Sequence, residues 1–169
     1  NGYVHLNAQT QETNAFDTLP LNQPTFSIIG TIVYTDPLQI GKIYTYSAGF
    51  MGNELSVSED HGSTRINLLN DFKTNLSALK KLPNSPNQIL AALSWGNEDP
   101  SLFLIDHSNL DNIQTTEFSL PDLTTFISSI IFPTNEDNYI LIALGSRIYK
   151  STNGGVTWDL YSNGLDILN

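Results

Sequence analysis

The most informative stretch of the chain is Ser151-Thr152-Asn153-Gly154-Gly155-Val156-Thr157-Trp158, near the C-terminus. It lies between two runs with strand character, residues 147–150 and 156–161. A Gly-Gly pair that follows Ser and Asn and precedes Thr-Trp is typical of a hairpin turn in which polar side chains bond to the backbone. Glycine favours such a turn because it adopts a positive φ at little cost. The stretch therefore predicts a β-hairpin that supplies its own side-chain hydrogen bonds.

A second copy of this pattern lies earlier in the chain, at Ser58-Glu59-Asp60-His61-Gly62-Ser63-Thr64-Arg65. The two stretches resemble the Asp-box of bacterial-neuraminidase-type (BNR) repeats, whose pattern is Ser-x-Asp-x-Gly-x-Thr-Trp. The later copy has Asn153 in place of Asp, and the earlier copy has Arg65 in place of Trp. The residues that we assign to the boxes are Ser151, Asn153, Gly155, Thr157 and Trp158, and Ser58, Asp60, Gly62 and Thr64. The resemblance implies a β-propeller in which the boxes are structural turns on the outer rim.

The spacing of the two copies indicates a repeat. They begin at positions 58 and 151, two periods of about 46 residues apart, and a four-stranded propeller blade has roughly 40–50 residues. A degenerate middle copy is expected in residues 101–109. Prolines at positions 37, 83 and 133 end the first strand of each unit, where a missing N–H is tolerated. The predicted strands are 26–37, 42–49, 54–58 and 64–69; 76–83, 88–94, 101–106 and 113–120; and 126–133, 139–145, 147–151 and 156–161.

These units predict a single all-β region built from blades. We expect a partial blade over residues 1–24, full blades over 25–73, 74–121 and 122–163, and the start of another unit at 164–169. Three blades cannot close a ring, since propellers typically have four to eight. We therefore expect the ring to be completed by the remainder of a longer chain or by self-association.

The segment 69–82 leaves two interpretations open. Its apolar residues Leu69, Phe72, Leu76 and Leu79 have the spacing of an amphipathic helix. The phase of the repeat and Pro83 favour a strand, a loop and a second strand instead.

The composition excludes several classes of function. The net charge is −10 with only seven basic residues, which disfavours nucleic acids and anionic membranes as partners. The absence of cysteine excludes disulfides, thiolate metal sites and a cysteine nucleophile. His5, His61 and His107 lack metal-ligand spacing, so neither a metal nor another cofactor is expected. No segment is apolar over the ~18 residues that a membrane-spanning helix needs. The start at Asn1 indicates a processed or trimmed chain, and we expect an extracellular or periplasmic location.

Catalytic residues are harder to assign. A sialidase of the resembled family needs three arginines, and this chain has only Arg65 and Arg147. Other Asp-box glycosidases, such as the xyloglucanases, use paired carboxylates. Candidates for such a pair lie in turns between predicted strands, where the alternative is a solvated loop; they are Asp36, Glu98, Asp99, Glu136 and Asp137.

Three aromatic residues, Trp95, Tyr44 and Tyr46, lie on or beside predicted second strands. They could stack on a sugar or an apolar partner, or pack in the core. The resemblance includes sortilin-like receptors, photosystem II assembly factors and glycosidases. We expect a non-catalytic scaffold that binds a protein, a peptide or a glycan, and the acidic surface favours a basic or neutral partner. One alternative is part of a secreted glycoside hydrolase whose catalytic residues lie partly outside this chain, and another is a purely structural repeat.

Overall fold

The computed structural model describes residues 4–6, 13–15, 29–36, 39–49, 52–72, 74–94 and 99–161. All regular elements in these ranges are β-strands, and none of the ranges contains a helix that could cross a membrane. A short antiparallel pair, β1 (Val4–Leu6) and β2 (Thr13–Ala15), comes first. It falls within residues 1–24, where the sequence predicted a partial blade.

Three four-stranded antiparallel sheets follow, each with its strands paired in chain order. The first sheet contains β3 (Ile29–Thr35), β4 (Ile43–Gly49), β5 (Gly52–Ser58) and β6 (Ile66–Phe72). The second sheet contains β7 (Asn75–Lys81), β8 (Gln88–Ser94), β9 (Ser101–Asp106) and β10 (Gln114–Phe118). The third sheet contains β11 (Ile127–Ile131), β12 (Ile140–Leu144), β13 (Arg147–Ser151) and β14 (Asp159–Leu160).

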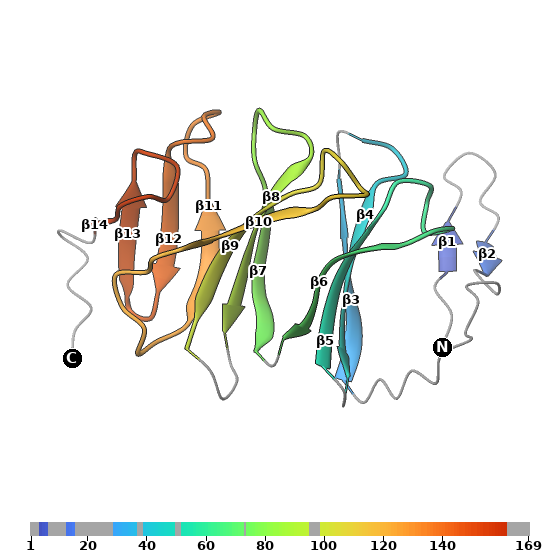
Figure 1. The fold of residues 1–169 in the computed structure, drawn as a ribbon, viewed down its shortest axis with the longest axis horizontal. Helices are drawn as coiled ribbons and strands as arrows, with labels where there is room; N and C mark the ends of the chain where they lie inside the picture. Colours follow the sequence, from blue (N-terminus) through green and yellow to red (C-terminus); the bar gives the residue numbers. More distant parts are fainter. Residues whose placement is uncertain are drawn as a thin grey trace.

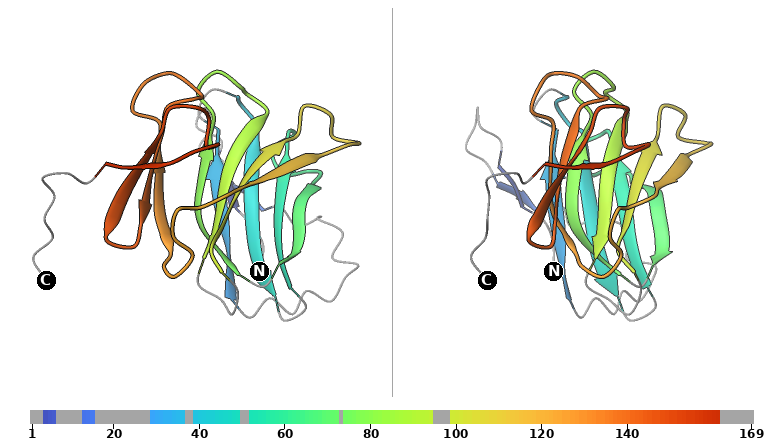
Figure 2. Two further views of the ribbon diagram at one scale, coloured as in Figure 1. Left: turned by 60° about the vertical axis from the view of Figure 1, so that its left-hand side comes forward. Right: turned by 90° about the vertical axis from the view of Figure 1, so that its left-hand side faces the viewer.

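The three sheets stand side by side and pack face to face (Figure 1). Strand β11 lies against β7 and β8, so the first strands of the second and third sheets are close together. The second sheet lies between the other two in Figure 1, and Figure 2 shows the same stack of sheets from the side. Two apolar clusters fill the spaces between the sheets, one on each side of the second sheet.

Burial along the second strands follows from this order. Strand β8 is buried from Ile89 to Ser94 on both faces, because a sheet covers each of them. In β12 only alternate residues, Ile140, Ile142 and Leu144, are buried. The third sheet therefore turns one face to the second sheet and leaves the other face less covered.

The segment 69–82 forms the end of β6 and the whole of β7, so the helix interpretation is wrong and the strand interpretation is confirmed. The helical spacing has a physical cause. The register of β7 against β8 shifts between Leu76 and Ala78, and this bulge places Leu76 and Leu79 against the same apolar cluster. Ile127 and Ile130 of β11 are buried together beside an equivalent shift.

Candidate binding site at the interfaces between sheets

The turn after β5 contains the residues of the earlier box. The hydroxyl of Ser58 donates to Asp60 Oδ1 at 2.8 Å and accepts the Gly62 N–H at 2.8 Å. The Asp60 carboxylate accepts the N–H of Thr64 at 2.8 Å and its hydroxyl at 2.7 Å. The bond from the Thr64 backbone is the main reason why the pKa of Asp60 lies below its ordinary value. These bonds close the turn on itself.

The turn after β13 repeats this geometry. Ser151 Oγ accepts the Gly155 N–H at 2.8 Å, and Asn153 Oδ1 accepts the Thr157 N–H at 2.9 Å. One bond runs in the opposite direction. In the earlier turn the threonine hydroxyl donates to Asp60, whereas here the amide of Asn153 donates to Thr157 Oγ1 at 2.8 Å. Trp158 packs against the apolar cluster between the second and third sheets.

The turn after β9 is built differently. Asp106 accepts the N–H of Ser108 at 2.9 Å and its hydroxyl at 2.6 Å, and Gln88 Nε2 donates to it at 2.7 Å. These bonds, led by that of the Ser108 hydroxyl, lower the pKa of Asp106. The degenerate copy expected here does form a turn, but it lacks the serine with which a box begins and the glycine of a box.

One backbone hydrogen bond recurs in all three turns and defines equivalent positions. The N–H groups of His61, His107 and Gly154 donate to the carbonyls of Gly41, Asn87 and Asn138, each at 2.9 Å. A second bond recurs at the end of the first strands, since Asp36 N–H donates to the Lys42 carbonyl at 3.2 Å and Leu82 N–H donates to that of Gln88 at 3.0 Å. His107 is thus equivalent to Gly154, and Asp36 to Leu82.

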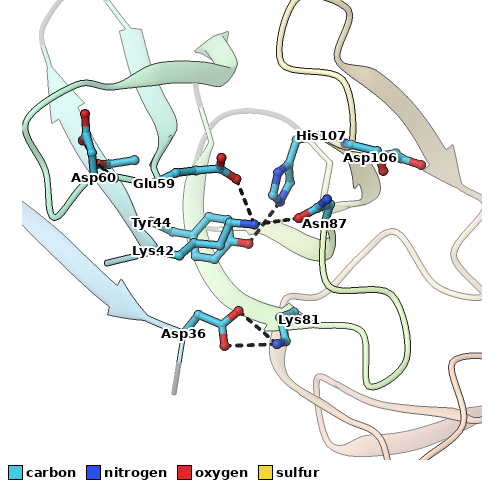
Figure 3. Close-up of polar contacts among 11 residues, drawn as sticks. Asp36, Lys42, Tyr44, Glu59, Asp60, Lys81, Asn87, Asp106 and His107 are labelled. Carbon is cyan, nitrogen blue, oxygen red and sulfur yellow. Dashed lines mark hydrogen bonds and ion pairs between the residues drawn. The ribbon is translucent and has the colours of Figure 1, made fainter. Parts of the chain in front are cut away.

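The interface between the first and second sheets, called the first interface below, contains an ion pair between Asp36 and Lys81 (Figure 3). Lys81 Nζ lies 3.0 and 2.9 Å from the two carboxylate oxygens of Asp36, whose side chain is 0% exposed. Nearby, the buried Lys42 donates to Asn87 Oδ1 at 2.7 Å and pairs with Glu59 at 3.1 Å. Both lysines bridge segments of the chain that are far apart in sequence.

Tyr44 and His107 complete the first interface. The Tyr44 hydroxyl lies 3.0 Å from His107 Nε2, and the two rings meet edge to face. His107 is 1% exposed, and its Nδ1 has no hydrogen-bond partner among the described residues. Burial, followed by the charge of Lys42, lowers the pKa of His107 to about 4. Burial also raises the pKa of Tyr44.

The aromatic residues singled out from the sequence are placed as follows. Tyr44 and Tyr46 are buried at the first interface, and the Tyr46 hydroxyl donates to Asn75 Oδ1 of the second sheet at 3.1 Å. Trp95 lies outside the described residues. The two tyrosine rings fill the interior between sheets in the arrangement that the core-packing alternative describes.

The candidate carboxylates are dispersed. Asp36 belongs to the buried ion pair, and Glu98 lies outside the described residues. Asp137 accepts the Asn84 N–H and the Ser85 hydroxyl, each at 2.7 Å, and so ties the loop of the second sheet to that of the third. Asp99 and Glu136 are exposed. Within the described ranges, no three His, Asp or Glu side chains are grouped to hold a metal ion.

The interface between the second and third sheets is called the second interface below. It has a pocket of about 190 Å³ at the end of the sheets where the first interface has its ion pair and its tyrosine–histidine contact. The residues that line it are Leu82, Leu90, Leu104, Phe118, Asp137, Asn138, Ile140 and Gly154. Sequence reasoning did not find this pocket. The signal was available in the repeat, because Leu82, Asn138 and Gly154 occupy the positions of Asp36, Asn87 and His107.

The sequence matches no protein-family model and no curated protein. Its structure is similar to that of an ancestral GH74 enzyme, with a TM-score of 0.54 and 21% identity over 75% of this chain. It is also similar to YCF48 from Cyanidioschyzon merolae, with a TM-score of 0.55 and 15% identity over 82% of this chain. The chain spans 18% and 38% of the length of these proteins, both of which are β-propellers. The predicted fold is confirmed: the described residues form an all-β structure whose three four-stranded sheets are propeller blades, and these sheets do not close into a ring.

Proposed function

We propose that this chain is part of a β-propeller that acts as a non-catalytic scaffold and binds a protein, peptide or glycan ligand. The observation that carries the proposal is that the carboxylates of Asp36 and Asp137 hold neighbouring sheets together. Both carboxylates bond to donors of a neighbouring sheet, Asp36 to Lys81 and Asp137 to Asn84 and Ser85. Acidic groups committed to fixing loops support a rigid binding surface, the usual use of propeller loops.

The two turns that contain Ser58 and Ser151 act as Asp-boxes in this proposal. Their shared hydrogen bonds, and the matching positive φ of Gly62 (91°) and Gly155 (94°), support that assignment. Their role is to stiffen the ends of the third and fourth strands. The ligand contacts are left to the connections between first and second strands.

The ring is completed by further blades, either from the remainder of a longer chain or from a second copy. On the face of the third sheet that points away from the second sheet, the large apolar side chain of Ile131 is 50% exposed. The second sheet is buried on both faces, so a blade in this fold is stable when both faces are covered. The uncovered face supports the expectation that another blade covers it.

A binding screen with arrayed peptides and glycans tests the proposal. We expect saturable binding of basic or neutral ligands. Salt should weaken the binding of the basic ones, because the chain carries a net charge of −10. Released reducing ends are measured on the same glycans. Sugar release that is lost in Glu136→Gln or Asp99→Asn would favour the hydrolase alternative, and a complete lack of binding would contradict the scaffold.

A further inference from the structure

The pocket at the second interface corresponds to a filled space at the first. Tyr44 comes two residues after Lys42, and Leu90 comes two residues after the equivalent Gln88. Tyr44 belongs to the cluster between the first and second sheets, and Leu90 to the cluster between the second and third. At the first interface the phenol of Tyr44 meets the imidazole of His107. At the second, Leu90 and Gly154 stand in these places and supply no ring, which leaves the pocket open.

The size and lining of the pocket suit one aromatic ring. Its volume is about 190 Å³, and an apolar cavity of about 150 Å³ is enough to hold benzene. Five of the side chains that line it are apolar, namely Leu82, Leu90, Leu104, Phe118 and Ile140. The ring of a ligand would therefore replace the contacts that Tyr44 makes at the first interface.

The polar part of the lining selects the chemistry of the ligand. Asp137 and Asn138 both line the pocket. The Asp137 carboxylate is fixed by Asn84 and Ser85, and each of its oxygens can accept a further hydrogen bond. Glu136 beside it is exposed, and the whole chain is acidic. A hydrogen-bond donor or a positive charge on the ligand is therefore favoured, and a carboxylate is disfavoured.

We propose that this pocket binds the side chain of a tyrosine exposed on a peptide or protein partner, with its ring among the leucines and its hydroxyl donating to Asp137. Basic residues next to that tyrosine strengthen the contact through the acidic loop. The inference rests on the proposed scaffold function and names the ligand chemistry of one site on it.

Titration with p-cresol, followed by NMR of leucine, isoleucine and valine methyl groups, tests the pocket directly. The methyl signals of Leu82, Leu90 and Ile140 should shift saturably, while those of Leu55 and Val57 at the first interface stay fixed. Toluene lacks the donor and 4-methylbenzoate carries a negative charge, so both should bind at least about tenfold more weakly, which is 1.4 kcal/mol. Absent shifts, or equal binding of toluene, would overturn the proposal.

Substitutions link the probe to a partner. Leu90→Tyr supplies the missing ring from within, as Tyr44 does, and should weaken p-cresol and tyrosine-containing basic peptides at least about tenfold. Leu90→Phe is a second filling variant in case the tyrosine does not fold. The matched control is Leu123→Tyr, at a position that is 49% exposed and outside the pocket, and it should leave binding unchanged. If the array ligands bind Leu90→Tyr as tightly as the parent chain, the pocket is not their binding site, but the scaffold function stands. If they bind neither protein, the scaffold function itself is contradicted.

Discussion

The two interfaces share one backbone frame and differ in what fills it. Equivalent backbone hydrogen bonds show that Asp36 and Leu82 occupy the same position in successive repeats, and that His107 and Gly154 do so as well. The first interface fills these positions with an ion pair and a tyrosine–histidine contact. The second uses leucine and glycine there and has a pocket. The repeat thus fixes the backbone, while individual side chains decide whether an interface is closed or open to a ligand.

The polar groups of the first interface make it sensitive to the loss of any single partner. A buried carboxylate is costly unless a cation remains beside it, whereas a well-packed apolar pair can replace the whole ion pair with little change. The second interface has apolar residues at the positions of these polar groups, and it is less tightly packed because of its pocket. The four predictions below follow from this contrast.

The largest effect is expected for Lys81→Met. It removes the cation from Asp36, whose side chain is 0% exposed, and should lower the free energy of unfolding by about 3–5 kcal/mol. Urea denaturation measures it. The double variant Asp36→Leu/Lys81→Met gives this interface the leucine that the second interface has and should recover most of the loss. A single variant as stable as the parent would contradict the role of the pair.

Acid should weaken the first interface through His107. Its folded pKa is about 4, below the ordinary value of 6.5, so the unfolded chain takes up the proton first. This contribution is complete above pH 6.5, declines as the pH falls and is lost by about pH 4, with a total of about 3 kcal/mol. The difference in unfolding free energy between the parent and His107→Gln, measured from pH 7 to pH 4, isolates it. A difference that is constant with pH would show that His107 is not buried as a neutral ring.

The adjacent glycines of the second interface should respond differently to alanine. Gly155 has a φ of 94°, and a Cβ there would lie 2.8 Å from the Phe118 ring. Gly154 has a φ of 70° with nothing within 4 Å of its Cβ position. Gly155→Ala should cost about 2–4 kcal/mol, from backbone strain plus overpacking, and Gly154→Ala about 1–2 kcal/mol, from strain alone. Thermal and urea unfolding compare the two, and equal losses would contradict the close approach of Phe118.

Local signals in the sequence account for most of the strands. The Gly-Gly turn, the second box copy and the three prolines placed four strands in each unit, and β4, β8 and β9 begin or end within one residue of the predicted limits. The helical spacing of Leu76 and Leu79 misled because a bulge puts residues three apart on one face. A bulge is a property of strand pairing and leaves no local mark in the sequence.

The candidate site could be predicted only in part. Asp36 and Asp137 were recognised as acidic residues, but their partners Lys81 and Asn84 are distant in sequence and meet them only when sheets pack. The pocket depends on the absence of a ring at Leu90 and of a side chain at Gly154, which no motif records. Comparing equivalent positions across the repeat would have shown both differences, since Tyr44 differs from Leu90, and Gly154 differs from His61 and His107.

The central claim is that Leu90 stands in an unfilled copy of the place that Tyr44 fills. Exchanging the two residues tests it most directly, by the free energies of unfolding of Tyr44→Leu and Leu90→Tyr. Tyr44→Leu should lose about 2–4 kcal/mol, because it empties the first interface and strips His107 of its partner. Leu90→Tyr should change stability by less than about 1 kcal/mol, because the pocket accepts the ring. Similar losses in both variants would show that the second interface has no room for a ring and would contradict the account.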